Sequence, residues 1–139
     1  HLAKHGKICA RASDIAPQSV SIKSGDATTQ LSCNGDCFIT NPPWSRPVLH
    51  KIIERLSDIA PAWLLFDADW MHTKQSGVLM DRCRKIVSVG RLRWIPNSKM
   101  TGKHNCAWYL FDDSCLRPTQ FVGRSALTGT ALNKMCLTQ

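Results

Sequence analysis

The chain has 139 residues, of which 43% are hydrophobic, and its formal net charge is +8. This length suits one domain with one core, and the hydrophobic content excludes an intrinsically disordered chain. The longest apolar run, APAWLLF at residues 60–66, is far too short to span a membrane, so we expect a soluble cytoplasmic protein.

Seven cysteines occur at irregular spacings along the chain. Only Cys33 and Cys37 are close together, and no second pair or nearby histidine completes a set of zinc ligands, so no metal site is predicted. We expect reduced, mostly buried thiols in a reducing compartment. The full set is Cys9, Cys33, Cys37, Cys83, Cys106, Cys115 and Cys136.

Three short strand-like segments come first. ICARAS (residues 8–13) is followed by Asp14, SVSIKS (residues 19–24) ends close to Asp26, and DCFIT (residues 36–40) runs into Asn41. The third segment is nearly continuous in apolar residues, which is typical of a strand covered on both faces. Polar side chains therefore gather where the predicted strands end.

An amphipathic helix and a fourth strand follow. In VLHKIIERLSDIA (residues 48–60) the apolar residues recur at helical spacing and the polar ones fall mostly on the other side. Pro47 suits the first turn of this helix, and Pro61 lies just past its end. AWLLFDADW (residues 62–70) then predicts a buried strand that ends at Asp67 or Asp69. The apolar helix positions are Val48, Leu49, Ile52, Ile53, Leu56 and Ile59.

The second half of the chain begins with a predicted short helix over residues 72–83, weakened by Gly77. KIVSVGRLRWIP (residues 85–96) and NCAWYLF (residues 105–111) then predict an antiparallel ribbon at a sheet edge, joined by the polar loop 97–104. Beyond residue 112 the periodicity is lost. We therefore expect a domain over residues 1–112 and a loosely ordered tail over residues 113–139.

Alternating strands and helices predict an α/β fold built on a layered sheet. Ligands of such folds bind outside the carboxyl ends of the strands. We therefore expect Asp14, Asp26, Asn41 and Asp67 to face one crevice.

The positive charge is concentrated in residues 82–111, which contain seven Lys and Arg residues and no Asp or Glu. This segment, the basic block, carries charges of one sign only and therefore favours a polyanionic partner, although a solvated basic face is the plain alternative. Arg91 and Arg93 alternate with Leu92 and Trp94, which predicts one basic and one apolar face of a strand. Nucleic-acid contacts are predicted at Arg46, Arg91, Arg93, Lys99 and Lys103, whereas Trp63, Trp70, Trp94 and Trp108 are expected to pack in or near the core.

The stretch CFITNPPWSRP (residues 37–47) ends a strand with an amide, two prolines and an indole. Two adjacent prolines have no backbone N–H, so the sheet ladder ends there. Asn-Pro-Pro-aromatic between a buried strand and an amphipathic helix resembles motif IV of the class I S-adenosylmethionine-dependent methyltransferases, chiefly the DNA adenine-N6 enzymes. FITNPPW, LLFDADWMH, GRLRWIP and TGKHNCAWYLF also resemble small phage-encoded members, over residues 8–112.

The resemblance implies a Rossmann-like sheet, mostly parallel with an antiparallel C-terminal ribbon, and it assigns catalysis to Asn41, Pro42, Pro43 and Trp44. In the family, the asparagine oxygen and the first proline carbonyl accept the two amino hydrogens of adenine, which directs the nitrogen lone pair at the methyl group. The prolines keep these acceptors rigid, and Trp44 would stack on a base flipped out of double-stranded DNA. This chemistry requires no metal.

The resemblance also assigns residues to the cofactor, S-adenosylmethionine. Asp14 matches the acidic residue that binds the ribose hydroxyls, and Asp26 matches the one that binds the adenine amino group. Ile15 and Ala27 would sandwich the adenine, and Asn41 lies beside the methyl group. Each aspartate also suits an ordinary turn at a strand end.

The family's glycine-rich turn after the first strand has no counterpart here. No G-x-G loop precedes Asp14, and HLAKHGK (residues 1–7) is similar to the end of the helix that follows such a turn. We expect the chain to begin inside the domain, to lack the central first strand, and to show little or no binding of S-adenosylmethionine by itself.

Three other functions fit the same residues. One is a methyltransferase that acts on RNA or on a protein glutamine; the basic block favours a nucleic acid, because clustered cations are useful chiefly against phosphates. Another is a nucleic-acid-binding remnant without catalysis. The third is a fold with neither activity, in which residues 41–44 form only a turn before a helix.

Overall fold

The computed structural model describes residues 2–95, 97 and 99–124. Short strands and 3₁₀ turns dominate the first part of the chain, and longer strands dominate the second. The elements are η1 (Leu2–His5), β1 (Ser13–Asp14), β2 (Lys23–Ser24), η2 (Ala27–Thr29), β3 (Phe38–Thr40), α1 (Arg46–Ser57), β4 (Ala62–Asp67), η3 (Ala68–His72), η4 (Lys74–Ser76), α2 (Gly77–Met80), β5 (Cys83–Arg91), β6 (Asn105–Phe111) and β7 (Gln120–Val122).

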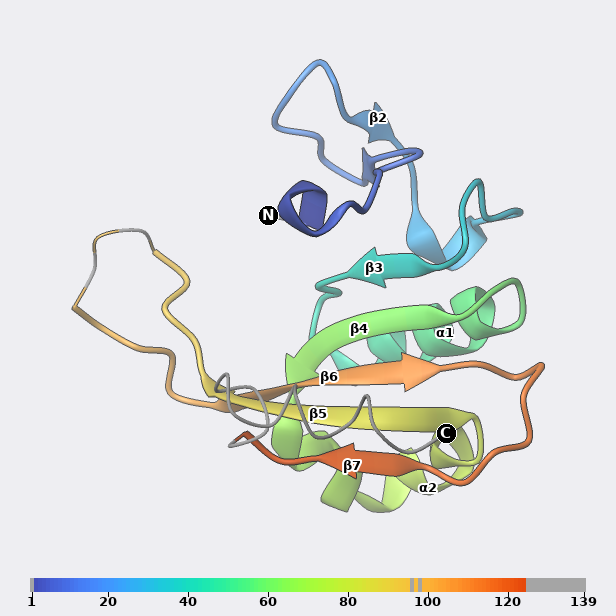
Figure 1. Cartoon of the computed structure of the whole chain (residues 1–139), viewed down its shortest axis with the longest axis vertical. Coiled ribbons are helices and arrows are strands. Elements are labelled where there is room, and N and C mark those ends of the chain that lie inside the picture. Colours follow the sequence, from blue (N-terminus) through green and yellow to red (C-terminus); the bar gives the residue numbers. More distant parts are fainter. Residues whose placement is uncertain (1, 96, 98, 125–139) are drawn as a thin grey trace.

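The main sheet has five strands in the order β3-β4-β6-β5-β7 (Figure 1). β3 is parallel to β4, β7 is parallel to β5, and β6 is antiparallel to both β4 and β5. Four strands therefore run in one direction and β6 alone runs in the other. The predicted α/β class is confirmed, and the predicted ribbon of β5 and β6 is present. The ribbon is not the edge of the sheet, because β4 and β7 flank it.

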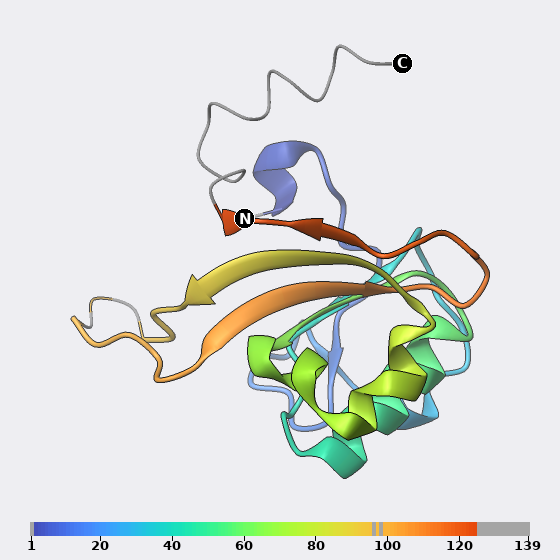
Figure 2. The same ribbon diagram turned by 90° about the horizontal axis from the view of Figure 1, so that it is seen from below.

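Helices α1 and α2 lie on the same face of this sheet (Figure 2). Leu49, Ile52, Ile53 and Leu56 of α1 are buried at the predicted spacing, and Ser45 precedes the helix. Under them, Phe66 stacks on Tyr109 with ring centroids 4.3 Å apart. The core of the domain is therefore this aromatic cluster, completed by Trp70 and Phe111.

The N-terminal segment differs from its prediction. The strands expected over residues 8–13 and 19–24 shrink to β1 and β2, two residues each, which pair only with each other. Ile8 and Val20 are exposed, so the apolar residues that suggested strands have no core to cover. β propensity alone does not extend a strand that lacks packing partners. No described strand pairs with the outer edge of β3.

Three contacts attach this segment to the domain. Ala27 of η2 packs against the core beneath α1, and Arg55 of α1 donates a hydrogen bond to the Gln30 carbonyl. Phe38 also donates its N–H to the Pro61 carbonyl at 2.9 Å, which fixes the start of β3 beside β4. The first forty residues are therefore positioned by η2 and β3, since β1 and β2 do not pair with the main sheet.

The region predicted as a loosely ordered tail contributes a strand. β7 pairs with β5 through Gln120, Phe121 and Val122. Thr119 donates its hydroxyl to the Cys83 carbonyl at 2.7 Å, which helps to hold this strand at the sheet edge. Within residues 113–124 the expectation of a loose tail is thus wrong at β7, and residues 125–139 lie outside the described part.

Two further predictions, of a helix and of a long strand, are wrong, and a glycine lies near the point where each expected element is interrupted. The helix expected over residues 72–83 is divided into 3₁₀ turns and a single α turn that begins at Gly77. The strand expected through residue 96 ends at Arg91, because Gly90 has a φ of 82° and lies at a register shift. The predicted alternation of Arg93 and Trp94 on two strand faces is therefore wrong.

Fewer cysteines are buried than expected. Of the six cysteines in the described residues, Cys83 and Cys106 are buried, Cys9 is exposed, and none is in a disulfide. Burial raises the pKa of the Cys83 thiol to about 11. Cys136 lies outside the described residues.

No helix in the described part of the chain is long and apolar enough to cross a membrane.

The aromatic cluster predicts which Phe matters for stability. Phe66 is 0% exposed, so Phe66→Ala should lower the free energy of unfolding by about 3–5 kcal/mol. The matched control is Phe121→Ala on β7, where the ring is 63% exposed and the change should stay within about 0.5 kcal/mol. Urea denaturation followed by tryptophan fluorescence measures both. If Phe66→Ala does not fold, Phe66→Leu should cost about 1 kcal/mol. Equal losses at the two positions would contradict the assigned core.

Candidate ligand cleft and nucleic-acid surface

One cleft of about 630 Å³ lies where the N-terminal segment meets the loop after β3. Every residue that the resemblance assigned to catalysis or to the cofactor lines it. Three separate stretches of the sequence are thereby brought to one place. The lining residues are Ser13, Asp14, Ile15, Gly25, Asp26, Ala27, Thr40, Asn41, Pro42, Pro43, Trp44, Val48, Ile52 and Trp94.

The loop of residues 41–44 is held at both ends. Thr40, the last residue of β3, pairs with Leu64 of β4. On the other side, the backbone carbonyl of Ser45 accepts hydrogen bonds from the N–H groups of Val48 and Leu49, at 3.0 and 2.8 Å. These bonds begin α1. Two prolines between these anchors leave few backbone conformations. The strand and the helix therefore fix the position of the loop.

Within this loop, Asn41 and Pro43 are exposed, Pro42 is buried and Trp44 is half-buried. The Asn41 side chain makes no hydrogen bond to any residue that the structure describes. Its amide oxygen is therefore available to a ligand in the cleft. Val48, which the helical pattern assigned to the buried face of α1, is instead 38% exposed and lines the cleft.

Asp14 and Asp26 serve both in turns and in the wall of the cleft. One carboxylate oxygen of Asp14 accepts the N–H of Ala16 at 2.8 Å. One carboxylate oxygen of Asp26 accepts both the N–H and the hydroxyl of Thr28, each at 2.8 Å, and these bonds lower the pKa of Asp26. Each aspartate keeps a second oxygen without a protein partner in the described part of the chain. The turn role and a ligand role are therefore compatible.

The cleft residues suit the adenosine part of a nucleoside cofactor. The free oxygens of Asp14 and Asp26 are acceptors for hydroxyl or amino groups, and Ile15, at 73% exposed, offers an uncovered apolar surface beside them. Ala27 and Val48 add apolar surface from η2 and α1. Among the described residues we find no glycine-rich turn that would hold the methionine end.

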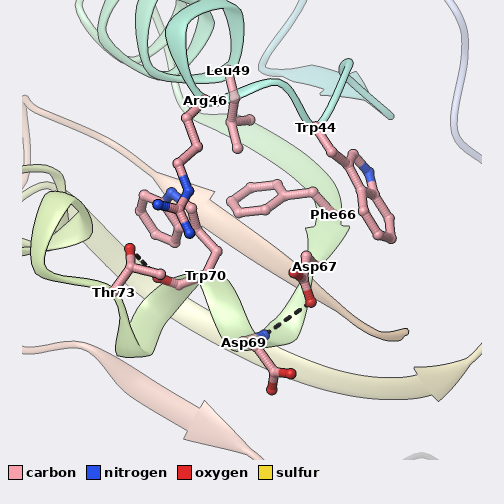
Figure 3. A pocket seen from close by; sticks show the side chains of 8 residues that line it. All are labelled: Trp44, Arg46, Leu49, Phe66, Asp67, Asp69, Trp70 and Thr73. Carbon is pink, nitrogen blue, oxygen red and sulfur yellow. Dashed lines mark hydrogen bonds between the residues drawn. The ribbon is translucent and has the colours of Figure 1, made fainter. Parts of the chain in front are cut away.

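A smaller pocket of about 110 Å³ adjoins the cleft and shares Trp44 with it (Figure 3). Asp67 lines this smaller pocket and not the cleft, so the prediction that it faces the same crevice as Asp14 is wrong. Its carboxylate accepts the N–H of Asp69 at 3.1 Å. Arg46, a predicted nucleic-acid contact, also lines this pocket and donates to the Gln75 side chain at 3.3 Å. Leu49, Phe66, Trp70 and Thr73 complete the lining.

Trp94 is an aromatic residue of the cleft that the sequence did not identify as part of the site. It was expected to pack near the core, but it is 46% exposed and lies against Trp44, with ring centroids 6.4 Å apart and planes at 72°. His104 lies on Trp44 in the same edge-on manner, at 6.1 Å. The signal that could have identified Trp94 is its place in a basic loop that returns toward the carboxyl ends of the strands. Of the other tryptophans, Trp70 is buried, and Trp63 and Trp108 are half-buried, as expected.

Six of the seven cations in residues 82–111 form two groups with different roles; the seventh, Lys85, is half-buried on β5. Arg82 pairs with Asp58 at 2.7 Å and with Asp113 at 3.7 Å, and Arg84 donates to the backbone carbonyl of Asp112. These two arginines hold α1 and the segment before β7 onto the sheet. The second group is Arg91, Arg93, Lys99 and Lys103, which are exposed and form no ion pair in the described residues.

This division predicts unequal effects of two arginine substitutions on stability. Arg82→Ala should lower the free energy of unfolding by about 1 kcal/mol, because it removes two ion pairs and a bond to Ser57. The matched control, Arg93→Ala, should change it by less than about 0.5 kcal/mol. Urea titration at low and high salt measures both. A larger loss for Arg93→Ala would contradict the division.

No group of three or more potential metal ligands exists within the described residues. Comparison with protein-family models, curated proteins and solved structures found no match for this chain. The function is therefore argued from the cleft and from the residues of the motif.

Proposed function

We propose that this chain is the catalytic domain, or part of it, of a methyltransferase that transfers a methyl group from S-adenosylmethionine to the N6 amino group of adenine in DNA. One observation carries the proposal. The residues assigned to the cofactor, Asp14 and Asp26, and the residues assigned to the methyl acceptor, Asn41 and Trp44, line the same cleft although up to thirty positions separate them in sequence.

The cofactor would supply an electrophilic methyl group. Asp14 would accept hydrogen bonds from its ribose hydroxyls, and Asp26 would accept one from its adenine amino group. The lowered pKa of Asp26 keeps this carboxylate ionised and therefore an acceptor. Ile15 and Ala27 would pack on the adenine ring and exclude water from it.

Asn41 would act on the nucleophile. The amino nitrogen of adenine is a weak nucleophile because its lone pair is delocalised into the ring. The free amide oxygen of Asn41 and the carbonyl of Pro42 would accept its two hydrogens, which would localise the lone pair on the nitrogen and direct it at the methyl group. Because β3 and α1 fix this loop, the acceptors are placed before the base arrives. Trp44 would hold the base by stacking.

The sheet supports the proposal as well. The resemblance implied a mostly parallel sheet with an antiparallel C-terminal ribbon, and four of the five strands of the main sheet run in one direction with β6 opposed to them. The loop of residues 41–44 follows a strand of this sheet at its carboxyl end, which is where α/β folds bind ligands.

A second candidate function is nucleic-acid binding without catalysis. The observation that favours it is the group of four exposed cations without ion pairs, together with the absence of a described residue set for the methionine end of the cofactor. The two functions differ in one result, since only the first requires methyl transfer.

The proposal is tested by substitution of Asn41. In a chain extended to include a glycine-rich turn, Asn41→Ala should reduce methyl transfer to adenine-containing duplex DNA by about 100-fold or more, the loss typical of removing one preorganised hydrogen-bonding group. The measurement is incorporation of label from methyl-labelled S-adenosylmethionine, followed by nucleoside analysis for N6-methyladenine. DNA binding, measured separately by fluorescence anisotropy, should be unchanged.

The matched control is Asn34→Ala, since Asn34 is another exposed asparagine, in the bend before β3, but lies outside the cleft. It should retain full activity. Activity retained by Asn41→Ala would remove the proposed role of the asparagine. No transfer by an unsubstituted chain extended to include a glycine-rich turn, with DNA binding intact, would favour the non-catalytic function.

A further inference from the structure

The loop between β5 and β6 folds back on itself and brings Trp94 to the cleft. The N–H of Gly102 donates to the Leu92 carbonyl at 2.8 Å, which closes the base of the loop. A side chain at position 102 would place its Cβ 2.9 Å from the indole nitrogen of Trp94 and 3.3 Å from the Leu92 carbonyl oxygen. Only glycine leaves room for this close approach, so Gly102 sets the position of the Trp94 ring.

Three aromatic rings from two distant segments meet as a result. Trp94 and His104 both lie edge-on to Trp44, at 6.4 and 6.1 Å. Nearly half of the Trp94 side chain remains accessible, and His104 is exposed. An exposed indole that is held by its neighbours offers a fixed stacking surface, whereas an unsupported one would lose side-chain entropy on binding.

The charges on the same loop favour a polyanion. Arg91, Arg93, Lys99 and Lys103 are exposed, and residues 91–105 contain no Asp or Glu. Cations beside stacking aromatic rings are the combination that holds single-stranded nucleic acid, since the cations follow the phosphates and the rings take the bases. A duplex keeps its bases stacked inside and cannot use such a ring.

We propose that the β5–β6 loop is a single-strand binding site, in which Trp94 stacks on the base next to the one presented at Trp44 and the four cations contact the adjacent phosphates. The ligand class is single-stranded or locally opened nucleic acid. The placement next to a methylated base rests on the proposed function, but strand binding by the loop does not. Gly102 is a positioning residue that acts through Trp94.

The test compares two labelled twelve-nucleotide strands with the same phosphates, oligo-dT and an abasic strand, by fluorescence anisotropy. The unsubstituted chain should bind oligo-dT more tightly than the abasic strand, by about 5- to 100-fold for one stacked base. Trp94→Ala should lower this preference by the contribution of one stacked base, about 5- to 100-fold, and leave the salt dependence of binding unchanged. Trp94→Phe should restore most of it.

The control variants separate stacking from charge and from folding. Gly102→Ala should reduce the preference as Trp94→Ala does, whereas Gly77→Ala should not, because a Cβ at Gly77 meets no atom within 4 Å. Ile95→Ala, at an exposed neighbour of Trp94, should also have no effect. Lys103→Ala should weaken both strands equally and lower the salt slope by about one.

Two results would overturn the inference. Equal affinity of the unsubstituted chain for oligo-dT and the abasic strand would show that no base stacks on the loop. A preference that Trp94→Ala leaves unchanged would assign the stacking elsewhere. Neither result bears on methyl transfer, so failure of this inference and failure of the proposed function are distinguishable.

Discussion

The cleft depends on how the N-terminal segment is attached to helix α1. That attachment consists of Ala27 packed beneath the helix and the hydrogen bond from Arg55 to the Gln30 carbonyl. Around it, β1 and β2 are two residues long and pair only with each other. Segments with few buried contacts open at lower free energy than the core. The wall with Asp14 and Asp26 is therefore less firmly held than the wall with Asn41.

The two sides of the site also differ in charge. Asp14 and Asp26 make the N-terminal wall acidic, which suits hydroxyl and amino groups of a nucleoside. The β5–β6 loop opposite is basic and aromatic, which suits phosphates and bases. Trp44 lies between them and contacts both the cleft and the smaller pocket beside Asp67. Under the proposed function, such a division of charge would place a nucleoside and a polynucleotide on opposite sides of one loop.

Much of this arrangement could be predicted from the sequence, because it depends on local patterns. The spacing of Leu49, Ile52 and Leu56 predicted α1, and the two prolines after Asn41 predicted the end of β3. What failed depends on tertiary contacts. The lengths of the first two strands could not be predicted from β propensity, because nothing in the sequence shows that Ile8 has no core to cover. β7 and the folded-back position of Trp94 could not be predicted either, because both require partners that are distant in the chain.

The central claim is that residues near positions 14, 26 and 41 form one nucleoside site. It is tested most directly by amide NMR, with adenosine and S-adenosylhomocysteine titrated in parallel. We expect the N–H signals of residues 14–16, 26–28, Asn41 and Trp44 to shift together with one dissociation constant. The two ligands should bind with similar, weak affinity, because the described residues offer no glycine-rich turn to hold the methionine end. Shifts confined to one of these segments, or no saturable shift at all, would contradict the claim.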